Sequence, residues 1–332
     1  MEQSLPSGDI DHCFPSQNSS CSVDIQVEYL IVNAIISIFL SVVTVFGNLL
    51  VITSICVFRQ LHSPANILTL SLAVTDLLVG VIIMPTNSVR LLVSCWRFGI
   101  TMCWFYNVFT WAITTSSLCH VVLIAINQYF AVCLPLQYNC KMSINRTVKC
   151  IFLCWTISFL YNILLTYFAH LEEEVPNVCA DECMGSFDNN LVITDMIITF
   201  IIPGTIIFIL YAQIFRVALK HLIKINSTRQ CNREKRALRI HEKKATKSLG
   251  TVVFVYLCCW IPLYISLMNA DKMSNPNLAV KYIMYLFYFN SSVNPFIYAF
   301  FHPWFKKSTK LILTLKILKP SSVDLNILPG SK

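Results

Sequence analysis

The sequence predicts an all-α integral membrane protein: a seven-transmembrane helix bundle followed by a short amphipathic eighth helix. The chain of 332 residues is 56% hydrophobic and only 13% charged, which is more apolar surface than a water-soluble particle of this size hides. Seven apolar runs are each about 20 residues or longer, enough to cross roughly 30 Å of hydrocarbon as helices. Basic residues gather on one side of the alternating loops. The natural solvent of this chain is therefore a bilayer.

The seven runs lie near residues 30–57, 66–91, 101–133, 148–169, 190–217, 246–268 and 280–301. We expect three parts: an extracellular N-terminal tail at 1–29, the seven-transmembrane bundle at 30–301, and an amphipathic helix with a cytoplasmic tail at 302–332. The last part begins with His302–Lys307 and continues with spaced apolar residues. That pattern is typical of a helix along the inner leaflet, so membrane lipids are expected partners.

The charge distribution predicts the orientation. About 29 residues precede the first run with five acidic residues and no Lys or Arg, whereas the leader of a signal peptide is basic. With that tail outside, 21 of the 25 basic residues fall on the cytoplasmic side, beside anionic lipids, so the net charge of +8 needs no nucleic acid. We expect a multi-pass plasma membrane protein with an extracellular N-terminus, glycosylated at the Asn18 sequon.

Most of the fifteen cysteines lie within apolar runs, where cysteine behaves as a small hydrophobe. Those on the outer side are Cys13, Cys21, Cys95, Cys103, Cys179 and Cys183. A disulfide from Cys103, at the start of run three, to Cys179 or Cys183 would pin the loop before run five over the mouth of the bundle. The remaining loop cysteine is then left for the N-terminal pair. The residues leave open which loop cysteine pairs with Cys103.

Two acidic residues lie inside the apolar runs. An ionisable group in a spanning helix costs a few kcal/mol, so each is a functional candidate. Asp195 lies one turn into run five, and Asp76 lies midway along run two, with polar partners available at Asn48, Ser117, Asn290 and Asn294. Prolines interrupt four runs, at Pro85, Pro203, Pro262 and Pro295, and each is either a hinge or a static bend.

Six motifs occur in a fixed order: Gly47-Asn48, Leu72-Ala-Val-Thr-Asp76, Trp155, Pro203 with Tyr211, Cys259-Trp260-Ile-Pro262 and Asn294-Pro295-Phe-Ile-Tyr298. Together they resemble the rhodopsin-like (class A) G-protein-coupled receptors across nearly the whole chain. The stretch from Asn290 to Lys307 and the paired outer cysteines are similar to the trace amine-associated receptors, relatives of the aminergic receptors. The resemblance implies a receptor that senses small cationic amines and activates a heterotrimeric G protein.

The expected ligand site departs from that family pattern. Where aminergic relatives carry an aspartate seven residues after the first cysteine of run three, this chain has the uncharged Thr110. Asp195 offers a replacement anchor that faces the same cavity as Thr110 and Thr114; the alternative is an interfacial acid that touches water or pairs with a loop cation. Three aromatic residues either enclose the ligand or belong to ordinary bundle packing: Trp260, Tyr264 and Tyr288.

The residues expected to couple the receptor to a G protein also depart from the family pattern. The family's Asp-Arg-Tyr at the end of run three reads Asn127-Gln128-Tyr129. Glutamine keeps hydrogen-bonding capacity but loses the guanidinium charge, so we expect a weaker inactive-state lock. Other expected switch residues are retained: Tyr211, Pro262, Pro295 and Tyr298. The basic loop 216–247 is expected to extend runs five and six and to form a docking surface for a G protein, or else a membrane-surface helix.

The resemblance also implies a sodium pocket at Asp76, Ser117, Asn290 and Asn294, with structural polar contacts as the alternative; no other metal or cofactor is expected. Rival classes fit less well. A transporter is disfavoured because no internal repeat is visible, and an opsin because Tyr288 stands where the Schiff-base lysine would be. The chain shows no enzyme-like nucleophile and base or metal cluster. Two alternatives stay open: a ligand-binding receptor with weak or no G-protein output, and a receptor for non-amine ligands.

Overall fold

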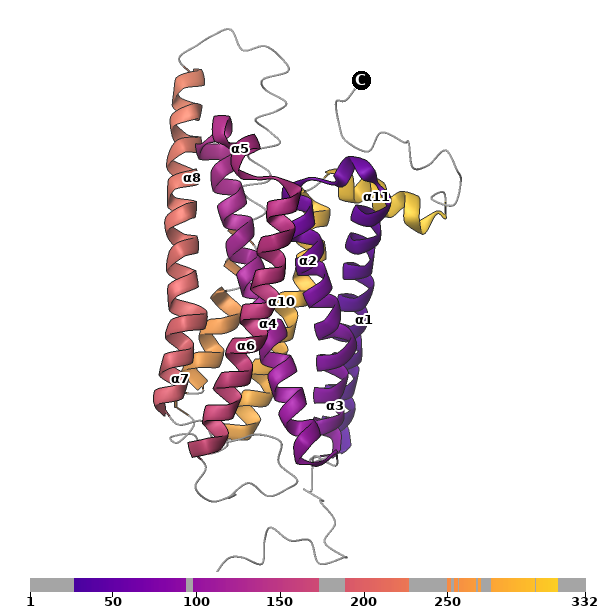
Figure 1. Ribbon diagram of the computed structural model, residues 1–332. Coiled ribbons are helices and arrows are strands. Elements are labelled where there is room, and N and C mark those ends of the chain that lie inside the picture. Colours follow the sequence, from indigo (N-terminus) through magenta and orange to yellow (C-terminus); the bar gives the residue numbers. More distant parts are fainter. Residues whose placement is uncertain are drawn as a thin grey trace, which may run out of the picture.

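The computed structural model is an elongated bundle of helices that run along a common direction (Figure 1). It describes residues 27–93, 98–172, 189–226, 276–301 and 303–315, and most of 250–269. Within these residues every regular element is a helix. Five helices are long and apolar enough to cross a membrane, and two more, Leu257–Ser266 and α10, follow at the positions of the sixth and seventh runs. The predicted all-helical architecture is confirmed.

The first three spans are α1 (Val27–Val57), then α2 (Pro64–Leu78) continued through the π-helical turn η2 (Val79–Ile83) into α3 (Met84–Val93), then α4 (Gly99–Cys133). The next two are α6 (Ile144–Glu172) and the composite of α7 (Asn189–Met196), the π-helical turn η3 (Ile197–Ile201) and α8 (Ile202–Asn226). The last two are the sixth-span helix (Leu257–Ser266) and α10 (Pro276–Phe301). Shorter elements are η1 (Arg59–Leu61), α5 (Pro135–Lys141) and α11 (Pro303–Leu313).

Some of these elements were not expected from the hydropathy pattern. The hydropathy pattern does not predict the two π-helical turns, because hydropathy depends on how apolar the side chains are and not on which backbone groups form hydrogen bonds. The loop helix α5 is too short to give a periodic signal, although Pro135 stands at its first turn, where a missing N–H is tolerated. Because α8 continues to Asn226, the expected extension of run five into the third cytoplasmic loop is confirmed for its first part. The rest of that loop lies outside the described residues.

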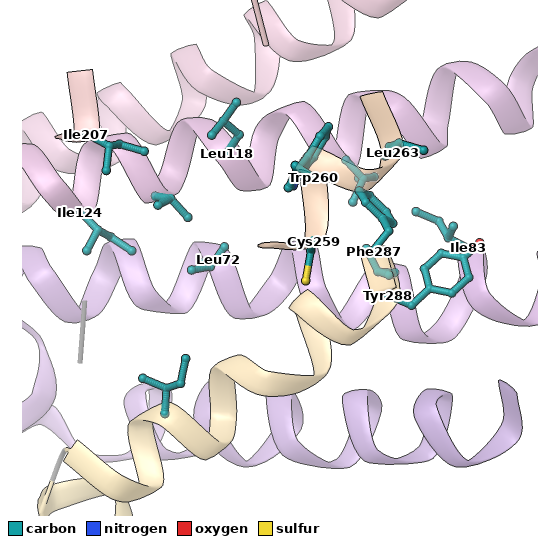
Figure 2. Packing of buried hydrophobic residues seen from close by; sticks show 14 of the residues in the cluster. Leu72, Ile83, Leu118, Ile124, Ile207, Cys259, Trp260, Leu263, Phe287 and Tyr288 are labelled. Carbon is teal, nitrogen blue, oxygen red and sulfur yellow. The ribbon is translucent and has the colours of Figure 1, made fainter. Parts of the chain in front are cut away.

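The helix α4 lies at the centre of the bundle and packs against α2, α6 and α8, while α1 packs against α2, α3 and α10. The main core lies where α2, α4, the sixth-span helix and α10 meet, and Figure 2 shows Leu72, Trp260, Phe287 and Tyr288 within it. These side chains pack against one another from segments that are far apart in sequence. The core therefore fixes the relative position of the spans that carry the candidate site.

The outer surface of the bundle is apolar. Phe39 on α1, Phe152 on α6 and Phe208 on α8 are exposed by 65%, 73% and 74%. Soluble monomers rarely carry a contiguous apolar surface of this extent, whereas in a bilayer these side chains contact lipid and the helices satisfy their own backbone groups. The exposed faces are thus the lipid-facing faces of membrane spans.

The eighth helix, α11, docks on the end of the bundle through one apolar edge. Trp304 and Phe305 are each 4% exposed and belong to a cluster with Val51 and Ile55 of α1 and with Phe58, which follows α1. Lys306 and Lys307 are exposed on the other side. The expected amphipathic helix is confirmed, and it lies at the same end of the bundle as α5 (Figure 1).

The first and last spans approach each other closely at Gly47. A Cβ added at Gly47 would lie 2.8 Å from Cγ of Pro295 on α10. Real Cβ atoms essentially never come so near another carbon, so the helix pair requires glycine at this place. The motif residues Gly47 and Pro295 therefore meet across the interface of α1 and α10.

Candidate functional site

Asp195 lies near the end of α7, where its carboxylate joins three helices. Tyr161 of α6 donates its hydroxyl hydrogen to Oδ1 at 2.9 Å. Tyr264 of the sixth-span helix donates to Oδ2 at 3.0 Å. Each carboxylate oxygen thus accepts a hydroxyl from a different neighbouring span. The interior position that was predicted for Asp195 is consistent with this geometry, because a lipid-facing or purely interfacial acid would not contact both spans four and six.

Thr199, one turn after Asp195, extends this network. Its hydroxyl lies 2.6 Å from the Tyr264 hydroxyl and 2.9 Å from the Asp195 carbonyl oxygen. Each hydroxyl has one hydrogen. Three contacts therefore share two hydrogens: if Tyr264 donates to the Asp195 carboxylate, the Thr199 hydrogen is shared between the Asp195 carbonyl oxygen and the Tyr264 oxygen. We call Tyr161, Asp195, Thr199 and Tyr264 the Asp195 site.

The charge of Asp195 has no partner of opposite sign in the described part of the chain. The interactions that bear on its carboxylate come from Tyr161, Tyr264 and Thr199, all of them neutral. Hydroxyl donors stabilise a carboxylate without cancelling its charge. The Asp195 site is therefore electrostatically suited to a cation.

Two predicted ligand residues lie on α4, and the structure gives them different environments. Thr110 is 4% exposed and its hydroxyl has no hydrogen-bond partner among the described residues. Thr114 donates its hydroxyl hydrogen to the Thr110 carbonyl oxygen at 2.7 Å. The Thr110 hydroxyl is thus the one that remains to be satisfied by water or a ligand.

The three predicted aromatic residues belong to one buried cluster that continues from the Asp195 site. Trp260 stacks on Tyr264 at 5.9 Å between ring centroids, and Phe287 meets Trp260 edge-on at 5.3 Å. Tyr288 follows, next to Phe287, at 5.9 Å. A row of rings therefore leads from Tyr264, which donates to Asp195, to α10. Figure 2 shows Trp260, Phe287 and Tyr288 of this row.

Asp76 on α2 is fully buried, with an Oδ2 that accepts a hydrogen bond from the Asn294 amide at 2.8 Å. Its Oδ1 has no hydrogen-bond partner among the described residues. The side chain of Ser291 on α10, which was not predicted, also interacts with the carboxylate. Among the described residues, neither Ser117 nor Asn290 forms a hydrogen bond with it. The structure thus joins two of the four residues of the expected sodium pocket and supplies a buried carboxylate oxygen, which is a ligand type that hard cations accept.

Comparison with known proteins gives the family. The family model described as "7 transmembrane receptor (rhodopsin family)" matches residues 47–298. Trace amine-associated receptor 13c of Danio rerio is 37% identical over 330 residues, 95% of each chain. Trace amine-associated receptor 7c of Rattus norvegicus is 36% identical, covering 98% of this chain and 94% of its own, and trace amine-associated receptor 6 of Homo sapiens is 36% identical, covering 95% of each. The chain belongs to the trace amine-associated receptors of the rhodopsin family.

This membership confirms the expected seven-transmembrane bundle and the G-protein-coupled receptor class. The receptor is a multi-pass plasma membrane protein, and its partners are a ligand and a G protein. It is not an enzyme. The described residues contain no group of His, Cys, Asp and Glu that would hold a metal ion by three such ligands.

The C-terminal part of α4 carries the altered triplet of this receptor. Asn127 is 3% exposed and accepts a hydrogen bond from Tyr138 of α5 at 3.2 Å. Burial raises the pKa of Tyr138, so the phenol keeps its hydrogen at neutral pH and acts as the donor. Gln128 and Tyr129 follow on the same turn, both half-buried. An amide in place of a carboxylate at residue 127 therefore still ties α5 to the third span.

Two tyrosines of the predicted switch lie inside the bundle. The Tyr211 hydroxyl on α8 is buried without a hydrogen-bond partner among the described residues. Tyr298 on α10 is 4% exposed and packs in the cluster that also holds Trp304 and Phe305. A buried hydroxyl without a partner is unfavourable by about 1–3 kcal/mol. The switch role of Tyr211 stays a prediction.

Sequence reasoning missed two features of the receptor. One is Tyr161, whose contact with Asp195 has no signal in an apolar run that holds several aromatic residues. The other is His120 of α4, which is fully buried and has ring nitrogens 2.5 Å from the Ser116 carbonyl oxygen and 2.7 Å from the Ser71 hydroxyl. Trp155 of α6 donates to the same Ser71 oxygen at 3.2 Å. The motif residue Trp155 thereby joins α2, α4 and α6.

Of the cysteines predicted to form disulfides, only Cys103 lies among the described residues. Cys103 is disulfide-bonded, with a partner outside the described residues, so its pairing with Cys179 or Cys183 stays a prediction. Cys13, Cys21 and the Asn18 sequon also lie outside the described residues.

Proposed function

We propose that this receptor senses small cationic amines at Asp195 and responds by activating a heterotrimeric G protein. One observation carries the proposal: a carboxylate on the fifth span is oriented by the hydroxyls of Tyr161 and Tyr264, and no described residue neutralises its charge. A ligand ammonium supplies the missing cation through charge-assisted hydrogen bonds. The names of the relatives, trace amine-associated receptors, agree with this class of ligand.

The neighbouring residues suit the rest of such a ligand. The unsatisfied Thr110 hydroxyl offers one hydrogen bond, and the face of Tyr264, stacked on Trp260, offers an aromatic surface to an ammonium or an aryl group. Because Thr110 has no charge, the ammonium is drawn toward the fifth span and away from the third. We therefore propose a ligand pose whose charged end lies at Asp195.

A panel of matched ligands tests this function. Arylalkyl amines and their neutral alcohol analogues of equal length would be applied to cells that express the receptor, with G-protein nucleotide exchange as the readout. We expect the amines alone to activate. Activation by the neutral analogues or by anionic odorants, with none by any amine, would establish the alternative of a receptor for non-amine ligands.

We further propose a sodium ion at Asp76, which would stabilise the inactive arrangement of the spans. The support is the buried Oδ1 without a hydrogen-bond partner, close to the hydrogen-bonded Asn294 and to Ser291. Agonist affinity is expected to fall several-fold when sodium replaces a large organic cation at constant ionic strength, and Asp76→Asn should remove this sensitivity. A response to sodium that persists unchanged in the Asp76→Asn receptor would place the ion elsewhere.

The triplet Asn127-Gln128-Tyr129 is expected to affect how strongly the receptor activates its G protein. A receptor with weak coupling is therefore the second candidate, because Gln128 lacks the guanidinium charge of arginine. Leu136 is 95% exposed on α5, which lies at the same end of the bundle as α11 (Figure 1). We propose Leu136 as part of the G-protein docking surface, together with the basic third loop.

If the altered triplet weakens the inactive state, restoring the family's aspartate and arginine at residues 127 and 128 should stabilise that state. In the double variant Asn127→Asp, Gln128→Arg, we expect ligand-free exchange to fall by about twofold to fivefold, because an ion pair whose arginine stays partly exposed contributes on the order of 1 kcal/mol. The two single variants complete a double-mutant cycle and isolate the pair's interaction. Unchanged ligand-free and agonist-driven exchange in the double variant would show that the triplet exerts no such hold.

We also propose that the N-terminus is extracellular. The distribution of basic residues supports it, and so does the position of α5 and the lysine-bearing α11 at one end of the bundle. On this orientation α11 lies against the inner leaflet, with membrane lipids as its partners.

A further inference from the structure

The Asp195 carboxylate contacts two tyrosines that offer the same hydroxyl donor but lie on helices that differ in their capacity to bend. Tyr161 lies on α6, which runs without a proline from Ile144 to Glu172. Tyr264 lies on the sixth-span helix, two residues after Pro262 and one turn after Trp260. A proline in a spanning helix removes a backbone hydrogen bond and permits bending there. Of the two hydroxyl donors, only the one from Tyr264 connects Asp195 to a helix with a built-in hinge.

The Tyr264 hydroxyl donates to a charged acceptor in a buried setting. Tyr264 and Thr199 are each 4% exposed, and the Thr199 hydroxyl, which donates to the Asp195 carbonyl, is the neutral acceptor that Tyr264 can use instead of the carboxylate. A hydrogen bond to a charged group contributes about 1.5–3 kcal/mol, against about 0.5–1.5 kcal/mol for one between neutral groups. The hydrogen bond therefore holds the sixth-span helix against the fifth span for as long as the Oδ2 lone pairs are available.

A ligand ammonium competes for those lone pairs. Charge-assisted hydrogen bonds are about twice as strong as neutral ones, so N–H groups of a bound cation displace or weaken the phenol donors at the carboxylate. Loss of the Tyr161 contact leaves α6 as it is. Loss of the Tyr264 contact releases the hinged helix, and the stacked Trp260 moves with it.

We propose that the Tyr264–Asp195 hydrogen bond restrains the sixth span in the ligand-free receptor, and that a bound ammonium relieves this restraint by replacing Tyr264 as the donor to the carboxylate. Tyr161 is a positioning residue that keeps the carboxylate oriented in both states. The role of the ammonium rests on the proposed function, whereas the restraint itself does not. A ligand shifts the equilibrium only through a difference in its affinity for the two states, and the restraint supplies that difference.

The test compares Tyr264→Phe with Tyr161→Phe in full-length receptor, measured as ligand-free G-protein nucleotide exchange per receptor at the cell surface. Each variant removes one hydroxyl donor from the same carboxylate. We expect Tyr264→Phe to raise ligand-free exchange about fivefold, which corresponds to the roughly 1 kcal/mol of one hydrogen bond. The rise in Tyr161→Phe should be smaller by a factor of about three or more.

A third variant controls for the loss of any buried tyrosine hydroxyl. Tyr285 of α10 contacts Ser37 at 3.0 Å and Asn33 at 3.2 Å, both on α1 and outside the Asp195 site. Tyr285→Phe should leave ligand-free exchange unchanged. If Tyr264→Phe reaches the surface poorly, Thr199→Val is the second measurement, because it removes the other hydroxyl contact between the fifth span and Tyr264 and should raise ligand-free exchange in the same direction.

The outcomes separate this inference from the proposed function. Equal exchange in Tyr264→Phe and Tyr161→Phe, or a fall in Tyr264→Phe and Thr199→Val, overturns the restraint even if amines are agonists. A selective rise in Tyr264→Phe supports the restraint even if no amine activates the receptor, since the measurement contains no ligand. In that second case the proposed function fails and the restraint stands.

Discussion

Replacement of Asp195 by asparagine is expected to raise the half-maximal concentration of an amine agonist at least a hundredfold at unchanged surface expression. The substitution keeps the size of the side chain and an acceptor for one tyrosine, but it removes the charge that faces the ammonium. Leaving one member of a buried ion pair without its partner costs about 3–5 kcal/mol, which is roughly two to three and a half decades of affinity. Concentration–response curves for nucleotide exchange measure this shift.

The matched control for this experiment is Asp195→Glu. It preserves the charge and moves it by one methylene, so potency should fall much less than in Asp195→Asn. A shift of threefold or less in Asp195→Asn would discard Asp195 as the anchor. Ligand-free exchange in Asp195→Asn gives a separate readout, because one amide oxygen cannot accept both tyrosine donors in the way two carboxylate oxygens do.

The second large effect is expected on the stability of the folded receptor. Gly47→Ala should destabilise the receptor by about 1–3 kcal/mol, the usual penalty for an overpacked interface, because the added Cβ would lie 2.8 Å from Cγ and 2.9 Å from Cβ of Pro295. Both neighbouring atoms belong to a rigid ring within a helix, so neither yields as the end of a flexible side chain would. We expect the melting temperature of the purified receptor to fall by roughly 5 °C.

Gly204→Ala on α8 is the matched control. A Cβ there would lie 4.0 Å from the nearest atom, in Leu257, which is an ordinary contact. Alanine also has a better helix propensity than glycine by about 1 kcal/mol. The Gly204→Ala receptor should therefore melt at the same temperature or slightly higher. Equal melting temperatures for both variants would show that α1 and α10 do not need glycine at residue 47.

The positions of the spans were predictable because a bilayer imposes length and apolar composition on them. The helix Pro276–Phe301 thus falls on the seventh predicted run. The amphipathic α11 was predictable for a related reason, since the alternation of Trp304, Phe305 and lysines matches an interface. Hydropathy does not register a change of hydrogen-bond pattern within an apolar run, and for that reason the turn at Val79–Ile83 was not foreseen.

The candidate site was predictable where charge made a residue conspicuous. Asp195 and Asp76 stand out in apolar runs because a buried acid is unfavourable without a reason. The partners of these acids were harder to predict: Tyr161 and Ser291 are uncharged and are common in such runs. Their roles follow from which faces of the helices meet, and that depends on rotations of the spans that a single sequence does not specify.

The π-helical turn Ile197–Ile201 lies between Asp195 and Tyr211, and it sets the phase of the fifth span. In an uninterrupted α-helix, two residues sixteen positions apart point about 160° away from each other at about 100° per residue, so one of them would face lipid. A single π-helical turn inserts one residue and reduces the angle to about 60°. That inserted residue lets one helix direct a carboxylate near one end and a buried phenol near the other, both toward the interior.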